Sequence, residues 1–224
     1  YPRWGAPQIH RKISAMEGAP CVSTVGNVLQ KAGLTQRRKI RPRATPSQGP
    51  LAHAQRANEL WCADFKGYFH TGDGRRCDPL TISDASSRYL LRCQGLSQGT
   101  GYWIVKPQFV ATFRQYGLPA GIRTDNGPPF ANRGMGGLSR LAIWWLRLGI
   151  RLERIAPGKP QQNGRHERIH RTLKEEAIHP PKGNLSRQQQ AFDAFMEEYN
   201  EERPHEALDQ ETPASHYQAS SREY

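Results

Sequence analysis

The sequence has 224 residues and a mass of 25.4 kDa, which suits one domain of ordinary size with a small appendage. Hydrophobic residues make up 36% and charged residues 23% of the chain, which excludes a low-complexity polymer and an acidic disordered tail. The longest apolar run, 141–146, is far shorter than the roughly 20 residues that cross a bilayer, so we expect no membrane partner.

Basic charge is concentrated near the start of the chain. The formal net charge is +12, and residues 1–50 hold nine basic residues and one acidic residue, whereas residues 185–224 hold three basic and nine acidic residues. Five of the seven positions from 37 to 43 are Lys or Arg. Such a run occurs as a solvated linker and as a phosphate contact, but the basic flanks favour a polyanionic partner.

The first predicted elements are two short helices. Trp4, Ile9 and Ile13 recur near a helical period, and after a Gly/Pro break Ser23 or Thr24 is expected to cap a second helix. The pair fits a plain helical hairpin as well as a helix-turn-helix, and the surrounding basic charge favours the DNA-binding motif. From about residue 35 to 57 there is no periodicity, and prolines at 42, 46 and 50 predict a linker.

Strands follow the linker. The alternation of residues predicts strands at 59–68, 79–82 and 88–93, and then at 121–124 and 150–155. Helical periods predict helices ending near residue 116 and around 141–148, 163–177 and 192–199. The order of elements implies an α/β or α+β domain with a mixed sheet and helices on its faces.

The cysteines and the first residues indicate the compartment. Cys21, Cys62, Cys77 and Cys93 are not spaced as a zinc knuckle, and we expect them to be reduced packing residues. The chain starts at Tyr1 without the apolar run of a signal peptide, so we expect an intracellular protein, present here as a complete chain or as a fragment.

Three acidic residues occupy positions that suit chemistry. Asp64 lies inside an otherwise apolar strand, Asp125 directly follows a short apolar strand, and Glu167 lies near the start of a helix. Each has an ordinary alternative: Asp125-Asn126-Gly127 is a common turn, and a Glu in a first turn complements the helix dipole. Asp78 and Asp84 fit strand ends or turns more simply, and at least one ring of Trp144-Trp145 fits the core better than a base-stacking role.

Six segments in chain order resemble the integrase core of bacterial insertion-sequence transposases and retroviral integrases. The segments are 61–67 (WCADFKG), 87–89 (SRY), 116–119 (YGLP), 124–127 (TDNG), 160–167 (PQQNGRHE) and 199–205 (YNEERPH). The resemblance covers about residues 57–217 and implies a ribonuclease-H-like fold, with a mixed five-stranded sheet and helices on both faces. It places the family's catalytic Asp-Asp-Glu on Asp64, Asp125 and Glu167, and implies a polynucleotidyl transferase.

The chemistry of that triad agrees with the resemblance. Three carboxylates at one end of a sheet cannot all stay ionised without cations, and oxygen ligands favour Mg²⁺ or Mn²⁺, as two ions in a two-metal site. Asp125 and Glu167 lie 42 positions apart, longer than the typical retroviral spacing, and the glycine-rich stretch 134–137 looks like the insertion.

The resemblance also implies an organisation and partners. We expect a helix-turn-helix-like segment at 1–36, a basic linker at 37–56, the catalytic core at 57–217 and a tail at 218–224. The partners are DNA, as element ends and target, and further copies of the chain in a synaptic complex; the location is the bacterial cytoplasm, at the nucleoid. The expected DNA contacts are Arg37, Arg38, Lys39, Arg41 and Arg43 in the linker, with Arg171 and Lys174 on the helical face of Glu167.

Two alternatives remain at this point. His166-Glu167-Arg168-Ile169-His170 also matches the H-E-x-x-H pattern of zinc metalloproteases, with Glu197 or Glu198 as a possible third ligand. A protease explains neither the basic N-terminal region nor the strands that carry Asp64 and Asp125, and His166 fits a packed, hydrogen-bonded residue. The other alternative is a DNA-binding transposase remnant that has lost catalysis.

Overall fold

The computed structural model describes residue 1 and residues 4–35, 54–132, 137–155 and 164–224. A six-stranded mixed sheet lies at its centre, in the order β2-β3-β1-β5-β6, with β4 paired to β3. Strands β1, β3 and β4 are antiparallel neighbours, whereas β5 runs parallel to β1 and β6 parallel to β5. The strands are β1 (Trp61–Phe65), β2 (Phe69–His70), β3 (Arg76–Asp84), β4 (Leu90–Leu96), β5 (Gly121–Thr124) and β6 (Arg151–Arg154).

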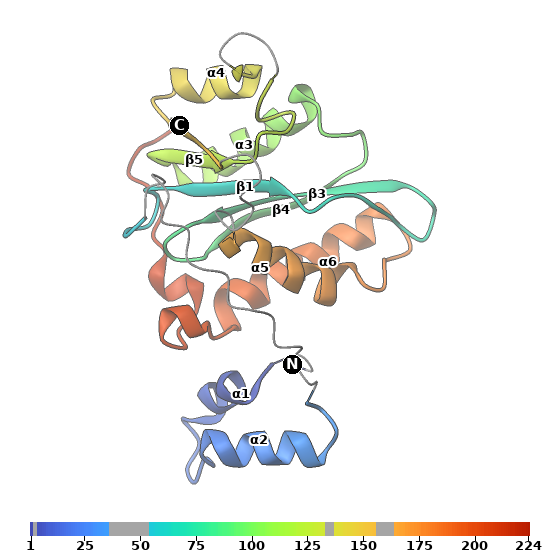
Figure 1. The fold of residues 1–224 in the computed structure, drawn as a ribbon, viewed down its shortest axis with the longest axis vertical. Coiled ribbons are helices and arrows are strands. Elements are labelled where there is room, and N and C mark those ends of the chain that lie inside the picture. The colour runs from blue at the N-terminus through green and yellow to red at the C-terminus, as the bar shows by residue number, and fades with distance from the viewer. Residues whose placement is uncertain (2–3, 36–53, 133–136, 156–163) are drawn as a thin grey trace.

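Helices cover both faces of the sheet, as the fold prediction requires (Figure 1). Helices α3 (Tyr102–Tyr116) and α4 (Arg140–Arg147) lie on one side, and α5 (Gly164–Leu173) and α6 (Leu185–Glu197) on the other. The strand alternation explains this arrangement, because Leu80 and Ile82 of β3 pack into the core beneath α3, while Cys77 packs among the residues of α5 and α6. Short helical segments extend the last two helices and the C-terminal region: η3 (Lys174–Ile178), η4 (Glu198–Glu202), η5 (Glu206–Leu208) and η6 (Pro213–His216).

The first hairpin differs from the sequence-based expectation. Strand β1 ends at Phe65, and Gly67 adopts a left-handed conformation with φ +87°, so the expected strand 59–68 is interrupted. The chain returns as the two-residue strand β2, which adds a sixth strand to the five expected. Strand β3 is longer than predicted, because Pro79 is accommodated within it.

Two helices form near the N-terminus, α1 (Ala6–Ile13) and α2 (Val22–Lys31). The predicted cap of α2 is wrong: the N-cap residue is Cys21, whose Sγ lies 3.1 Å from the hydroxyls of Ser23 and Thr24. Cys21 is exposed and does not pack in a core, whereas the other three cysteines are buried, and all four are free thiols. The N-terminal region contacts the core through Trp4 Nε1, which donates to Glu198 Oε1 at 3.2 Å, and Lys12 Nζ, which donates to Glu202 Oε2 at 3.1 Å.

The C-terminal residues fold back onto the turn between α3 and β5. Ser220 N donates to Tyr116 O at 2.8 Å, and Leu118 N donates to Arg222 O at 2.7 Å. Gly117 lies between them with φ +75°, and a Cβ there would stand 2.6 Å from Ser220 O. The close approach therefore requires glycine at this position. Among the described residues, no helix combines the length and apolar character needed to span a membrane.

Candidate active site

Asp64 lies on β1, a central strand of the sheet. Its register partner on β3 is Thr81, and its side chain is 21% exposed. The amide of Phe65 donates to Asp64 Oδ1 at 2.8 Å. Burial raises the pKa of Asp64 to about 7, with a further increase from the nearby negative charges of Asp125 and Glu167, against a lowering effect of the Phe65 amide.

Asp125 and Glu167 approach Asp64 from two other elements. Asp125 follows the last residue of β5, whose parallel pairing with β1 brings the carboxyl ends of the two strands to the same edge. Gly127 N donates to Asp125 Oδ1 at 3.2 Å, and Asn126 Nδ2 donates to Ile155 O at 2.7 Å, so the turn is held to the end of β6. Glu167 is exposed near the start of α5. The structure thus brings Asp125 and Glu167 within electrostatic reach of Asp64.

The donor set fits a hard divalent cation. Three carboxylates supply only oxygen ligands and negative charge, and after burial the charges of Asp125 and Glu167 contribute to the raised pKa of Asp64. In residues 4–35, 54–132, 137–155 and 164–224, however, no three His, Cys, Asp or Glu side chains are grouped closely enough to hold a metal ion. The three side chains are of the type that binds a divalent cation, but they are not grouped as closely as the ligands of one ion.

His166 and His170 point into the molecule behind Asp64. They are 1% and 7% exposed, and both Nε2 atoms lie 2.7 Å from Thr81 Oγ1. Ser83 Oγ lies 3.0 Å from the other ring nitrogen of His166, and His170 Nδ1 lies 4.0 Å from Asp64 Oδ2. Burial lowers the pKa of His166 to about 3 and, together with His166 and Lys66, lowers the pKa of His170 well below its ordinary value, so both rings are neutral near pH 7.

This geometry counts against a zinc centre. A zinc ligand needs a ring nitrogen with its lone pair open toward the metal. Both nitrogens of His166 and Nε2 of His170 instead contact the hydroxyls of β3. The interpretation of His166 as a packed, hydrogen-bonded residue is confirmed.

The other acidic and aromatic candidates have structural roles. Asp84 is buried and accepts from the amides of Asn58 and Ser87 at 2.8 Å, and Asp78 forms a bidentate pair with Arg76 at 2.7 and 2.8 Å. Trp145 is 1% exposed and belongs to the core. Trp144, its neighbour, is only partly buried.

The predicted DNA contacts fall into two groups. Arg171 of α5 and Lys174 of η3 are exposed on the same side of the helix as Glu167, as the helical period predicts. The linker residues Arg37, Arg38, Lys39, Arg41 and Arg43 lie outside the described residues, as does most of the glycine-rich stretch 134–137.

Sequence reasoning missed two groups of side chains. Thr81 was not singled out, because its contact with both histidines depends on the pairing of β1 with β3 and on α5 crossing that pair. Trp103 and Lys106 were missed as well, although a Trp three residues before a Lys places both on one face of α3.

Sequence comparison with known proteins shows which family the chain resembles. Two sequence profiles, both described as Integrase core domain, match residues 54–160 and 148–213. An insertion element IS407 uncharacterized 31.7 kDa protein of Burkholderia multivorans is 27% identical over 215 residues, covering 95% of this chain and 74% of its own length.

Solved structures agree on the fold. A chain of the simian T-cell lymphotropic virus intasome, in complex with the PP2A regulatory subunit B56 gamma, matches 99% of this chain and 76% of its own with a TM-score of 0.62 and 18% identity. The HTLV-2 integrase catalytic core domain in complex with magnesium, in its trimeric form, matches 74% of this chain and 100% of its own with a TM-score of 0.57 and 16% identity. The ribonuclease-H-like fold expected from the sequence is confirmed.

Proposed function

Because the chain belongs to the integrase-core family of insertion-sequence transposases and retroviral integrases, we propose that it catalyses metal-dependent cleavage of DNA strands and their transfer into target DNA. The observation that carries the proposal is the electrostatic coupling of buried Asp64 to Asp125 and Glu167 at one edge of the sheet. Burial, and secondly the charges of Asp125 and Glu167, raise the pKa of Asp64 to about 7, and a bound cation would offset both effects.

In this proposal Asp64, Asp125 and Glu167 would hold two Mg²⁺ or Mn²⁺ ions between them. Bound there, the ions would supply activation of an attacking water or 3′-hydroxyl and stabilisation of the leaving 3′-oxygen. Backbone amides of this chain position two of the carboxylates: Phe65 N donates to Asp64 Oδ1 at 2.8 Å, and Gly127 N donates to Asp125 Oδ1 at 3.2 Å.

DNA is the proposed partner, both as element ends and as target. The N-terminal helices and the basic linker at 37–56 bind it outside the core, and Arg171 and Lys174 contact phosphates near the carboxylates. Two DNA ends must be joined in one event, so at least two copies of the chain act together. The likeness to an intasome chain and to a trimeric integrase core supports this assembly.

The test measures cleavage and strand transfer on oligonucleotides that carry the element ends. Asp64→Asn, Asp125→Asn and Glu167→Gln should each reduce both steps by at least about a thousandfold, because each removes a metal ligand, while DNA affinity is retained. Asp73→Asn, an exposed carboxylate in the turn before β3, is the matched control and should keep full activity. A triad variant that nicks at the wild-type rate would remove that residue from the site.

Two controls separate the alternatives. Protein stripped of metal should recover with Mg²⁺ or Mn²⁺ and not with Zn²⁺, because the carboxylates supply hard oxygen ligands. A wild-type chain that binds the ends but never nicks, with either cation, would instead be a catalytically silent DNA-binding remnant.

A further inference from the structure

The N-terminal helices are attached to the core by side chains that donate hydrogen bonds. Trp4 lies just before α1, and Gln8 and Lys12 lie one helical turn apart on the same face of α1. Every acceptor is an oxygen atom of segment 198–204. The bonds run from Trp4 Nε1 to Glu198 Oε1 at 3.2 Å, from Gln8 Nε2 to Pro204 O at 2.9 Å and from Lys12 Nζ to Glu202 Oε2 at 3.1 Å.

This attachment is polar and partly open to solvent. In the described part of the chain, the hydrophobic clusters of the core contain no residue of α1 or α2. The side chains of Lys12 and Glu202 are 47% and 41% exposed, and ion pairs between side chains of such exposure contribute little to stability. The hydroxyl of Tyr1 also donates to Glu202. Because these contacts are polar and weak, other oxygen atoms can replace segment 198–204 on the face of α1.

The donors on this face suit the backbone of DNA. Lysine, glutamine and other side-chain donors commonly contact phosphate oxygens in protein–DNA complexes. His10 and Arg11 lie in the same turn as Lys12, and residues 1–50 hold nine basic residues and one acidic residue, so the surroundings favour a polyanion. Segment 198–204 presents carboxylates to the donors that would contact phosphates. The acidic segment and DNA therefore exclude each other from this face.

We propose that the surface formed by Trp4, Gln8 and Lys12 binds phosphates of duplex DNA, and that segment 198–204 covers this surface in the chain without DNA. The contact is then autoinhibitory, because DNA must displace the acidic segment before α1 can bind. The apparent affinity for DNA is consequently lower than the affinity of the uncovered surface. The inference rests on the proposed function for the identity of the ligand as DNA, but it requires no divalent cation and none of the three carboxylates of the candidate active site.

The first test is fluorescence anisotropy of the full chain with a labelled duplex of about 20 base pairs in EDTA. Glu202→Gln should raise the affinity about threefold, because Lys12 loses its charged partner and the covered state becomes less populated. Glu201→Gln is the matched control. Glu201 is exposed beside Glu202, carries the same charge and, within the described residues, forms no ion pair with α1. Its replacement should raise the affinity by less than about 1.5-fold, through long-range charge alone.

A second set of variants tests whether Lys12 itself contacts DNA. Lys12→Gln should lower the slope of log affinity against log salt by about 0.9, because one phosphate contact is lost. In the Lys12→Gln background, the effect of Glu202→Gln should shrink toward that of Glu201→Gln.

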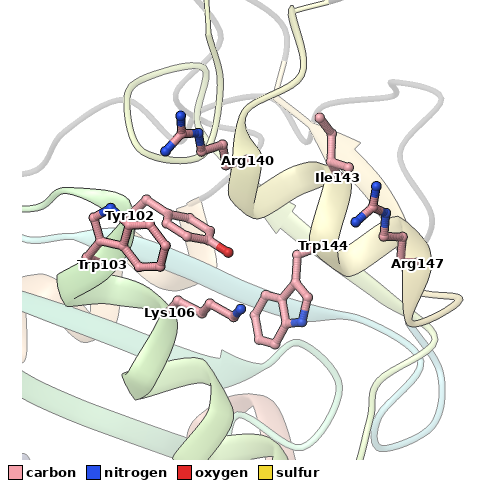
Figure 2. Close-up of a pocket in the computed structure, with 7 residues that line it drawn as sticks. All are labelled: Tyr102, Trp103, Lys106, Arg140, Ile143, Trp144 and Arg147. Carbon is pink, nitrogen blue, oxygen red and sulfur yellow. The ribbon is translucent and has the colours of Figure 1, made fainter.

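The control lysine is Lys106 of α3, which lies on a different surface. Figure 2 shows it between Tyr102 and Trp144 in the groove between α3 and α4, with Nζ 5.5 Å and 5.2 Å from the two ring centroids. Lys106→Gln should leave the salt slope and the effect of Glu202→Gln unchanged.

Hydrogen exchange of the full chain measures the displacement itself. Duplex DNA in EDTA should speed amide exchange in segment 198–204 of the wild type, and Glu202→Gln should speed it without DNA. Equal affinities of Glu202→Gln and Glu201→Gln would overturn the proposal, and so would exchange in this segment that DNA leaves unchanged or slows. Neither measurement involves cleavage. A wild type that nicks DNA while these tests fail would keep the proposed function, and one that passes them without ever nicking would lose only the proposed catalysis.

Discussion

Asp64 is a carboxyl group placed where ionisation costs free energy. Its pKa in the folded chain is about 7, against an ordinary value of 3.8, chiefly because it is buried and secondly because Asp125 and Glu167 lie near it. Between these two pH values the folded state binds more protons than the unfolded state. The contribution of this group to the free energy of unfolding therefore falls as pH rises from about 4 to 7. Above pH 7 Asp64 is ionised in both states, and its destabilisation of the folded state no longer increases.

Asp64→Asn should stabilise the metal-free protein above pH 7 by on the order of 2–4 kcal/mol, because the amide carries no charge to bury. At pH 4 the two proteins should unfold alike. Urea unfolding at both pH values in EDTA measures the difference. Asp73→Asn is the control and should show no gain, since hydrogen bonding by the Thr71 hydroxyl lowers the pKa of Asp73 instead. A variant no more stable than wild type at pH 8 would contradict the assignment.

The Thr81 hydroxyl should contribute to the stability of the fold. Its hydroxyl is the shared partner of the buried Nε2 atoms of His166 and His170. Thr81→Val keeps the shape but leaves both nitrogens unsatisfied, so we expect a loss of about 2–4 kcal/mol in the free energy of unfolding. Thr81→Ser retains the hydroxyl and should lose far less. Equal losses in the two variants, measured by urea unfolding, would show that packing and not hydrogen bonding is responsible.

Sequence patterns single out the three carboxylates as candidates, but they do not single out the residues that contact them. Asp64 stands out because an acid interrupts an apolar strand, and Asp125 because it ends one. Thr81 and Ser83 look like ordinary strand residues, and their contacts follow from register across more than eighty positions to His166. Local patterns carry no information on such long-range pairings.

At the scale of elements, the strand and helix order was largely predictable and the boundaries were not. The five longer strands and all four core helices lie where periodicity placed them. The errors arise where backbone geometry overrides the pattern: Gly67 interrupts the first strand, and Pro79 remains inside β3. The two-residue strand β2 is too short to produce any periodic signal.

Helix α5 carries the element-scale prediction. Arg171 and Lys174 are exposed on the side of Glu167. If each neutralises one phosphate, Lys174→Ala should weaken binding equally for specific and scrambled duplexes and lower the slope of log affinity against log salt by about one unit. Anisotropy titrations at several salt concentrations measure this slope. Arg114→Ala, which removes an exposed cation from α3, is the control. An unchanged slope for Lys174→Ala would mean that Lys174 is exposed to solvent and contacts no phosphate.

At the scale of the whole molecule, the most basic segment of the chain and the three candidate catalytic carboxylates lie in different regions of the sequence. Residues 1–50 hold nine of the 32 basic residues and one of the 20 acidic residues, whereas the three carboxylates proposed to bind metal belong to the core. The N-terminal helices nevertheless contact the acidic C-terminal region, through Trp4 to Glu198 and Lys12 to Glu202.

This separation predicts that affinity and cleavage can be changed independently. Replacing the five basic residues at 37–43 with Ser should lower the slope of log affinity against log salt by up to about 4.5 units for duplex DNA, because each contact releases a counterion. Cleavage of saturating DNA should remain near the wild-type rate, since the carboxylates are untouched. Replacing Lys182 and Arg187 with Ser is the control for total charge, and its slope should stay close to that of the wild type. A linker variant with an unchanged slope would show that the core alone binds the phosphates, and one that fails to cleave even when fully bound would show that the linker positions DNA in the active site.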